Sequence, residues 1–517
     1  MSDPCLHIYQ YRYAMKKLLL ALCAFFAMSL STMAQLTYLM RSTPEEEGVR
    51  SKDVLAYIDT LMRQKQSDMH GVMILRNGKV IAEKYNEPFG PQYSHTQYSA
   101  SKTFTAVAVG MAIQDSLLHL TDRLVDFVPA EMLPEVVGDS LAMITVEDLL
   151  TMRSGFPVDT NMRTIYSDWI RQYLSHQLVA LPGTRFAYDS IDTYLLSAIV
   201  QQVEGQTLFD FLKARLFTPM GITQVAWEQS PEGITCGGWG LYIQLESMAK
   251  FGQLLLQRGE WNGQQLVSAE WIDQMTQLHV SQSNGQQYGY QIWLTDRPGM
   301  VRCDGAWGQY IYVIPDRQMV VAMTQCKRGG KVDAEATNRL CKAVGENVAP
   351  LPETADTRTL KNARYRFTPT RGKQTGRHLM PVKLSLGTNP LDWRAVEFAF
   401  NRQSNLSNPQ LVLKVTTKTG ETFDLVCDYQ RWNLNEIKGF PLNLRAFVNN
   451  FSNIRPPFYA AASYGWTTDD DLYIRLHYVN WISSCLLHFR FVGNRVEPDI
   501  VISSSDKRIR FNATVTK

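Results

Sequence analysis

The sequence predicts an α+β protein in which an antiparallel sheet is flanked by helices, stands beside a helical region and is followed by a smaller all-β domain. The first observation is the order of the elements. Strand-like runs come first, helical stretches dominate to about residue 260, and strands and a last helix follow. The second is an alternation of apolar and polar residues beyond about residue 375, which is typical of half-buried strands. The chain has 517 residues, more than one ordinary hydrophobic core organises, so two domains are expected.

The larger, N-terminal domain carries clear local signals. Two apolar-rich runs flank Asn77 and Gly78, which predicts a β-hairpin with a tight turn. Thr145 and Asp148 have the spacing of a capping box, so a helix is expected to begin after Thr145. The helical run IDTYLLSAIVQQVEG should end at Gly205, because glycine readily adopts the left-handed conformation that ends many helices.

The remaining elements define the domain boundaries. Strand character returns at YGYQIWL and at QYIYVIPDRQMVVAM, and a helix is expected from residue 333 to residue 348. We therefore assign residues 35–349 to the first domain, residues 350–375, which contain Pro and Thr, to a linker, and residues 376–517 to an accessory all-β domain. In DLYIRLHYVN of that last domain, one strand face collects four apolar residues: Leu472, Ile474, Leu476 and Tyr478.

The N-terminal segment predicts export. Residues 15–35 combine two lysines, an 11-residue apolar run and a small-residue end, which are the features of a secretory signal. We expect residues 1–34 to be a signal peptide, translation to begin at Met15, and the protein to be periplasmic or extracellular. The apolar run is too short to span a bilayer. The bulky Leu22 before Cys23 argues against a lipoprotein anchor at that cysteine.

Composition excludes several classes of partner. The chain has 52 basic and 49 acidic side chains, a formal charge of +3, and therefore no excess of charge that would attract nucleic acid or a membrane surface. Six cysteines lie beyond residue 34, without a CxxC pair or a metal-binding spacing with histidine, and the sequence does not say whether they pair. We expect no transmembrane segment, no metal and no organic cofactor.

Chemistry is indicated by a serine and a lysine three residues apart, Ser99 and Lys102. The following run, FTAVAVGMAIQ, is apolar or small on every face, which predicts a central buried helix. A lysine in the first turn of such a helix is opposed by the helix dipole and by burial, and both lower its pKa. A neutral amine on the same helix face can take the proton of Ser99. The alternative is a serine cap with a lysine that extends to solvent.

Two other Ser-x-x-Lys pairs lack this environment. Ser247 and Lys250 lie in LESMAKFGQLLL, where Glu246 stands four residues before Lys250 and indicates an exposed ion-pair face. Ser504 and Lys507 lie in SSSDK, which reads as a polar turn. Context therefore favours the first pair as nucleophile and base.

Four further segments accompany Ser99 and Lys102 in order: LLTMRSGF (149–156), PGTRFAYDSIDTYLL (182–196), GGWGLYIQLESMAKFGQLLLQRGEWNGQQ (237–265) and CDGAWGQYIYVIPDRQMVV (303–321). With them, residues 40–348 resemble the serine β-lactamase and penicillin-binding-protein superfamily, in its class C-like branch with esterases, D-aminopeptidases and 6-aminohexanoate-dimer hydrolases. The resemblance implies a β-lactamase/transpeptidase-like fold for this domain.

The resemblance also implies roles for single residues. Ser99 matches the acylated nucleophile and Lys102 its activating base. Tyr188 matches the tyrosine of a Tyr-x-Asn element, which exchanges a proton with the lysine. Ser190 replaces the asparagine of that element and is expected to line the substrate site, where its hydroxyl can donate a hydrogen bond. Either Asp189 or Ser190 would also serve as the N-cap of the helix that follows.

A third family element, Lys-Thr-Gly or His-x-Gly, lies on a strand beside the site. The literal Lys-Thr-Gly at residues 418–420 stands between two strand-like runs beyond the linker, where it predicts a hairpin turn. The order of motifs instead selects Cys303, Asp304 and Gly305, which we expect to line the substrate site, with Gly305 allowing the substrate close to the strand.

Two consequences follow for the oxyanion hole and for substrate recognition. The resemblance assigns the oxyanion hole to the backbone N–H groups of Ser99 and Ala306. Cys303 stands where the family has a lysine, a histidine or a small residue, so a substrate carboxylate loses a cationic partner. No histidine is near Cys303 in sequence to activate its thiol, so a buried thiol is expected rather than a second nucleophile.

These features predict an exported serine hydrolase that cleaves an ester or amide through an acyl-enzyme on Ser99. Its partner is a small-molecule ester, amide or peptide substrate. One alternative is a β-lactamase or D,D-carboxypeptidase acting on peptidoglycan-like ligands, and another is a catalytically weak protein that binds cell-wall fragments. Other hydrolase signatures are missing: AASYG around Ser463 lacks the strand-to-helix context of a nucleophile elbow, and HExxH does not occur.

Overall fold

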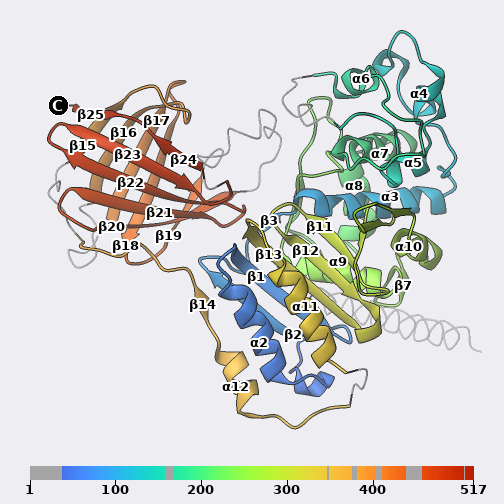
Figure 1. Cartoon of the computed structure of the whole chain (residues 1–517), viewed down its shortest axis with the longest axis horizontal. Coiled ribbons are helices and arrows are strands. Elements are labelled where there is room, and N and C mark those ends of the chain that lie inside the picture. The colour runs from blue at the N-terminus through green and yellow to red at the C-terminus, as the bar shows by residue number, and fades with distance from the viewer. Residues whose placement is uncertain are drawn as a thin grey trace, which may run out of the picture.

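The computed structural model describes residues 38–158, 167–345, 349–374, 381–401, 410–437, 457–505 and 507–516. Within these residues the chain forms an α+β part and a C-terminal β-domain, as the sequence predicts (Figure 1). The expected signal peptide, residues 1–34, lies outside the described residues. In the described part of the chain, no helix is both long and apolar enough to cross a bilayer.

A nine-stranded sheet forms the centre of the α+β part, in the order β14-β2-β1-β13-β12-β11-β10-β9-β8. Its strands are β1 Ser67–Arg76, β2 Lys79–Glu87, β8 Val280–Ser281, β9 Gln287–Tyr288, β10 Trp293–Leu294, β11 Val301–Gly305, β12 Gln309–Ile314, β13 Met319–Lys327 and β14 Tyr365–Arg366. The hairpin at Asn77 and Gly78 is confirmed, because β1 and β2 pair antiparallel across that turn. The run YGYQIWL, expected as one strand, is two short strands, since a turn containing Gln291 with φ 56° interrupts it.

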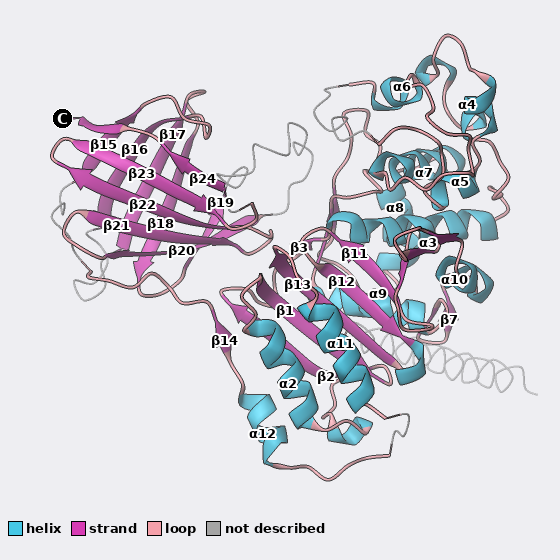
Figure 2. Cartoon of the chain, viewed as in Figure 1, coloured by secondary structure: helices cyan, strands magenta, loops and turns pink. Residues whose placement is uncertain are grey.

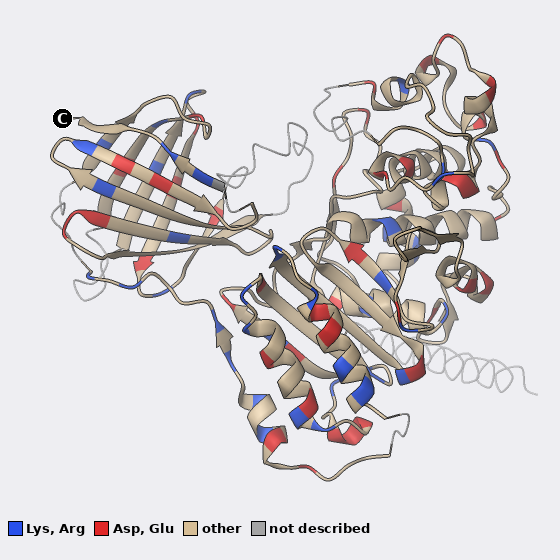
Figure 3. Ribbon diagram, viewed as in Figure 1, with Lys and Arg blue, Asp and Glu red and all other residues tan. Residues whose placement is uncertain are grey.

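Helices cover both faces of this sheet (Figure 2). On one face lie α2 Ser51–Met62 and α11 Val332–Ala343, whose apolar residues share a core with Tyr310 and Tyr312 of β12. On the other face lie α3 Ser101–Gln114 and α9 Leu245–Leu256, which share a core with Ile311 and Val320. Figure 3 shows both acidic and basic residues on α2 and α11, and on α11 the acidic residues lie in the first turn and a basic residue in the last.

A helical region stands beside the sheet. It contains α4 Asp139–Met143, α5 Val146–Leu150, α6 Trp169–Leu174, α7 Ser190–Glu204 and α8 Leu208–Leu212, with α10 Ala269–Thr276 near β8. The capping box is confirmed, because the Thr145 side chain accepts from the Asp148 backbone and the Asp148 side chain accepts from the Thr145 backbone. The predicted end of α7 is also confirmed, with Gly205 left-handed at φ 66°. Local capping chemistry therefore sets the helix ends that frame the site.

The segment expected as a linker is structured. Within residues 350–375 the chain forms α12 Ala355–Asn362 and β14, which pairs parallel with β2. Leu360 of α12 is buried in the core beneath α2. The connection therefore packs against the α+β part before the β-domain begins.

The C-terminal β-domain is an antiparallel sheet that closes into a barrel through a pairing of β18 with β20. Its strands are β15 Val382–Leu386, β16 Trp393–Asn401, β17 Gln410–Thr417, β18 Thr422–Tyr429, β19 Asn433–Ile437, β20 Phe458–Trp466, β21 Asp471–Tyr478, β22 Ser484–Val492, β23 Arg495–Ile502, β24 Lys507–Arg510 and β25 Ala513–Thr516. The four residues predicted to share one face of β21 are all in its core, which confirms the alternation. Lys418 lies in the turn between β17 and β18, as expected, and pairs with Asp392.

Candidate active site

Ser99 lies in a 3₁₀ turn, Tyr98–Ala100, that leads directly into α3. Residues 101–112 of α3 are buried on every face, which confirms the predicted central helix. Strand β3, His95–Thr96, enters this turn, and it pairs with β5, Leu241–Ile243. The serine is thus held at the junction of a short strand and a rigid helix.

Lys102 is 1% exposed, and its amine has three oxygen partners. Nζ lies 3.1 Å from Ser99 Oγ, 2.9 Å from Ser190 Oγ and 2.7 Å from the Gly238 carbonyl oxygen. An ammonium would donate to all three oxygens. A neutral amine has two N–H donors and one lone pair, so Ser99 can then donate its proton to Nζ while Ser190 and Gly238 remain acceptors. The same three contacts therefore suit both protonation states that a general base must adopt.

The start of α7 brings Tyr188 and Ser190 to this amine. Asp189 is the N-cap, because its Oδ1 accepts from the Ile191 N–H at 2.9 Å. The cap fixes the turn, and its neighbours project to the lysine. Ser190 accepts from Nζ, and the Tyr188 ring centre lies 5.0 Å from Nζ. Capping and the site thus use the same three-residue turn.

Gly238, which the sequence interpretation did not single out, completes the lysine's environment. A Cβ on Gly238 would lie 2.5 Å from the Ser190 carbonyl oxygen, and one on Gly237 would lie 2.7 Å from Thr105 Oγ1. Only glycine fits at these two positions without displacing its neighbours. The glycine pair at residues 237–238 was the available signal, because paired glycines often mark a close backbone approach.

Strand β11 passes beside Ser99, but Gly305 serves another purpose than the expected one. A Cβ there would lie 2.2 Å from the Gln97 carbonyl oxygen, so the missing side chain lets the chain before Ser99, rather than a substrate, approach the strand. Ala306 follows at the exposed end of β11. Gly305 therefore sets the distance between the two backbone segments that carry Ser99 and Ala306.

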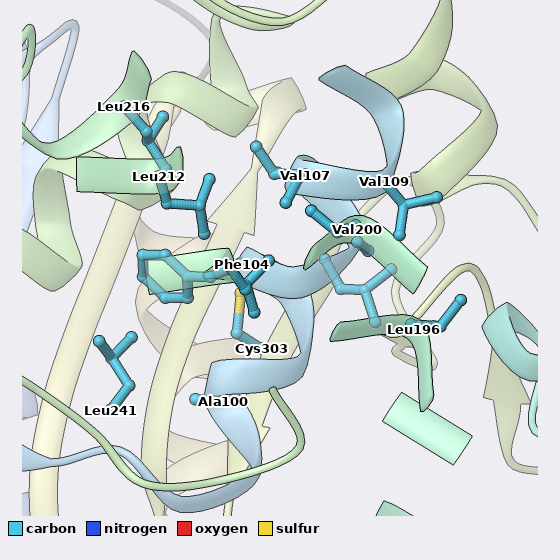
Figure 4. Close-up of a cluster of buried hydrophobic side chains, with 14 of the residues drawn as sticks. Ala100, Phe104, Val107, Val109, Leu196, Val200, Leu212, Leu216, Leu241 and Cys303 are labelled. Carbon is cyan, nitrogen blue, oxygen red and sulfur yellow. The ribbon is translucent and has the colours of Figure 1, made fainter. Parts of the chain in front are cut away.

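The side chains of Cys303 and Asp304 point away from the position expected for them. Cys303 is fully buried in the core between β11 and α3, near Ala100 and Phe104 (Figure 4). The expected buried thiol is therefore confirmed, and burial raises the pKa of this thiol to about 12, which disfavours a second nucleophile. Asp304 points to the opposite sheet face, where it pairs with Arg302. As substrate-lining side chains both expectations are wrong, because alternate strand residues enter the two cores flanking the sheet.

The second Ser-x-x-Lys pair also differs from expectation. Lys250 is 3% exposed instead of lying on an exposed face, and Nζ donates to the carbonyl oxygens of Met220 and Gly221. Glu246 pairs with Arg41 rather than with Lys250. Lys250 therefore satisfies chain carbonyls and has a structural role. Cys303, Cys341 and Cys427 are free, buried thiols.

Two buried carboxyl groups, those of Asp189 and Asp192, lie close together behind the turn that contains Tyr188. Asp192 is fully buried, and the Tyr173 hydroxyl lies 2.9 Å from Asp189 Oδ2 and 3.4 Å from Asp192 Oδ1. Burial and the neighbouring Asp189 raise the pKa of Asp192 well above its ordinary value. A raised pKa favours a proton on this pair over two carboxylates that would repel each other. No group of three or more potential metal ligands occurs among the described residues.

Comparison with known proteins agrees with this architecture. The model of the family described as Beta-lactamase matches residues 54–345. The chain is 24% identical over 325 residues to the 6-aminohexanoate-dimer hydrolase of Paenarthrobacter ureafaciens, covering 54% of this chain and 78% of that protein. It is 25% identical over 199 residues to Protein flp of Staphylococcus aureus, covering 35% of this chain and spanning only 40% of that relative's length.

A solved structure shows the same fold. A Bacillus anthracis protein described as a 6-aminohexanoate-dimer hydrolase superimposes with a TM-score of 0.52 at 17% identity, covering 62% of this chain and 90% of that protein. At this identity the likeness concerns the fold alone.

Proposed function

The chain belongs to the beta-lactamase family, and from that membership we propose that it is a serine hydrolase that cleaves esters or amides through an acyl-enzyme on Ser99. The observation that carries the proposal is the Ser99 to Lys102 contact of 3.1 Å at an almost solvent-free amine. In this proposal Lys102 takes the proton from Ser99 Oγ as the oxygen attacks the carbonyl, and the leaving group departs with a proton. Water then attacks the ester that the acyl group forms with Ser99, and the acid is released from the serine.

Other residues assist these steps in the proposal. Tyr188 and Ser190 adjoin the amine and pass protons between it and the leaving group. The N–H groups of Ser99 and Ala306 stabilise the oxyanion. Family membership and the relatives' hydrolase names support the reaction class. The roles of Tyr188 and of the two N–H groups rest on the family resemblance, and proximity to the lysine supports those of Tyr188 and Ser190.

The substrate is proposed to have a neutral acyl side. Cys303 supplies no cation at the strand, and Arg302 is occupied by Asp304 on the opposite sheet face. The Tyr188 ring lies beside the lysine and packs against the rings of Tyr288 and Trp293, and aromatic rings favour apolar groups. A charge-assisted hydrogen bond contributes roughly 1.5–3 kcal/mol, so its absence disfavours penicillins, which carry a carboxylate.

A labelling experiment tests this function. The protein and its Ser99→Ala variant are treated with a fluorescent fluorophosphonate and with a fluorescent penicillin, and hydrolysis of a p-nitrophenyl ester is followed in parallel. Ser99→Ala should lose about four orders of magnitude in turnover and all fluorophosphonate labelling. Ser247→Ala is the matched control, because Ser247 begins the same Ser-x-x-Lys spacing on α9 and should stay active.

The outcomes separate the candidate functions. Normal labelling of Ser99→Ala would show that another residue is the nucleophile. Rapid penicillin turnover by the unmodified protein would favour a β-lactamase or D,D-carboxypeptidase, and slow penicillin binding without ester hydrolysis would favour a cell-wall-fragment-binding protein.

Export is a further part of the proposal. It rests on the signal-like residues 15–35, since neither the fold nor the relatives bear on it. Expression of the full chain in a Gram-negative host, followed by fractionation and N-terminal mass analysis, should find a periplasmic protein that begins near residue 35. A cytoplasmic protein that retains residues 15–34 would contradict it.

A further inference from the structure

We infer that two turns of the C-terminal β-domain position the residues next to the two oxyanion donors, so that this domain is part of the catalytic unit rather than an accessory. The turns are residues 480–483, called the 480 turn, and residues 503–505, called the 504 turn. The inference rests on the proposed function, in which Ser99 and Ala306 supply the oxyanion hole.

The contacts fall on the immediate neighbours of those donors. Tyr98 precedes Ser99, and its ring centre lies 5.6 Å from that of Trp481 in the 480 turn, edge to face. Trp307 follows Ala306, and its Nε1 donates to the Ser504 carbonyl oxygen of the 504 turn at 3.1 Å. The rings of Tyr98 and Trp307 also contact each other, with centres 4.9 Å apart. One aromatic cluster therefore joins both donor segments to the β-domain.

Backbone conformation explains why these two residues need support. Tyr98 has φ 47° and Trp307 has φ 58°, in the left-handed region that bulky side chains disfavour. Residues persist there only when their surroundings hold them. If Tyr98 relaxed, the peptide plane that it shares with Ser99 would rotate, and the Ser99 N–H would turn with it. If Trp307 relaxed, the preceding residue Ala306 would shift along with the chain. The aromatic cluster and the hydrogen bond to Ser504 supply the restraint.

The two turns are themselves fastened together and to the strand that enters the site. Ser483 Oγ and Ser504 Oγ are 2.9 Å apart. The Asn480 carbonyl accepts from the Thr96 N–H at 3.1 Å, and Asn480 Nδ2 donates to the Ser94 carbonyl at 2.8 Å. The β-domain is thus hydrogen-bonded to β3 only three residues before Ser99. A rigid link of this kind can hold reacting groups to a fraction of an ångström.

The test uses the full chain and three variants. Trp481→Leu removes the ring that faces Tyr98, and Trp481→Phe keeps an aromatic ring there. Trp307→Phe removes the N–H that reaches Ser504 and keeps a smaller aromatic ring beside Tyr98. The measurements are kcat and KM for a p-nitrophenyl ester, the second-order rate of fluorophosphonate labelling, and the melting temperature. We expect Trp481→Leu and Trp307→Phe to lower kcat and labelling about tenfold with KM within about twofold, because misplaced donors affect the transition state more than binding. Trp481→Phe should recover most of the loss.

A control at the same domain interface separates positioning from general loosening. Phe89 packs against Ala461 and Val479 of the β-domain and stacks on His70, and its ring centre lies 6.4 Å from that of His95 in β3, outside the aromatic cluster of Tyr98, Trp307 and Trp481. Phe89→Leu should lower the melting temperature as much as Trp481→Leu and leave kcat unchanged. Wild-type kcat in both Trp481→Leu and Trp307→Phe would overturn the inference, as would an equal loss in Phe89→Leu. Because Ser99→Ala reports on the nucleophile separately, either result with Ser99 still essential leaves the proposed function standing.

Discussion

Replacing Gly305 by alanine should displace the catalytic turn without straining the strand. The φ of Gly305 is not in the left-handed region, so alanine fits its backbone conformation. Its Cβ, however, would lie 2.2 Å from the Gln97 carbonyl oxygen, whereas close carbon–oxygen contacts are about 3.3 Å. The turn must therefore move by about 1 Å, and a misplacement of that size can cost about 100-fold in rate. Gln97 is fully buried and its carbonyl accepts from the Ala100 N–H, so the movement passes to Ser99.

The assay is kcat/KM for a p-nitrophenyl ester, together with the fluorophosphonate labelling rate and a melting curve that confirms a folded protein. Gly299→Ala, just before β11, is the matched control. Gly299 has φ 74° but no described atom within 4 Å of the added Cβ, so alanine there strains the backbone and displaces nothing. Gly299→Ala should lose stability of about 1–2 kcal/mol and keep its activity. A folded Gly305→Ala protein with wild-type turnover would refute the link between this close approach and the position of Ser99.

Three further expectations concern buried titrating groups. Cys303→Ala should retain ester hydrolysis within about threefold. Iodoacetamide should not inactivate the folded wild-type protein, because a thiol with a pKa of about 12 is scarcely ionised at pH 8. Rapid inactivation of the wild type that Cys303→Ala prevents would contradict the burial of this thiol. The pKa of Asp192 is raised in the folded protein, so stability is lost as the pH rises from about 4 through that raised pKa. Asp192→Asn should therefore have a higher melting temperature than the wild type at pH 8. A lower melting temperature would count against a retained proton. Burial lowers the pKa of His95 to about 4 and of His477 to about 3, so stability should fall as pH drops below about 6.5, by about 3 kcal/mol from His95 alone near pH 4. Melting curves from pH 8 to pH 4 check this, and a His477→Phe variant should be less acid-sensitive; an unchanged melting temperature between pH 7 and pH 5 would oppose it.

The features that the sequence predicts well are those decided by neighbouring residues. Thr145 and Asp148 cap a helix wherever that helix lies, and Gly205 ends α7 through its own backbone freedom. The Ser99 to Lys102 contact belongs to the same class. Its two residues lie one turn apart, and the uniformly apolar run after them is enough to predict burial.

Features that depend on distant segments were predicted less well. Lys250 follows the spacing of an exposed ion pair, but it is buried where its amine donates to the carbonyls of Met220 and Gly221, which come from another part of the chain. The order of motifs selects Cys303 and Asp304 as the strand element beside the site, yet a strand sends alternate side chains to opposite faces. The sheet face that each side chain reaches depends on the pairing register of β11 with β12. The residues near β11 in the sequence do not reveal that register.

Two contacts next to the proposed chemistry join segments that lie far apart in the sequence. Gly238 reaches Lys102 from 136 residues away, and Ser504 reaches Trp307 from 197 residues away. Both contacts use a backbone carbonyl, which every residue possesses, so no side-chain pattern distinguishes Gly238 or Ser504 as a partner. What the sequence does show is the need for such partners. A lysine in a buried helix start must find acceptors, and an indole N–H that becomes buried must find one as well. The sequence can therefore identify the groups that demand a partner, while the fold decides which carbonyl supplies it.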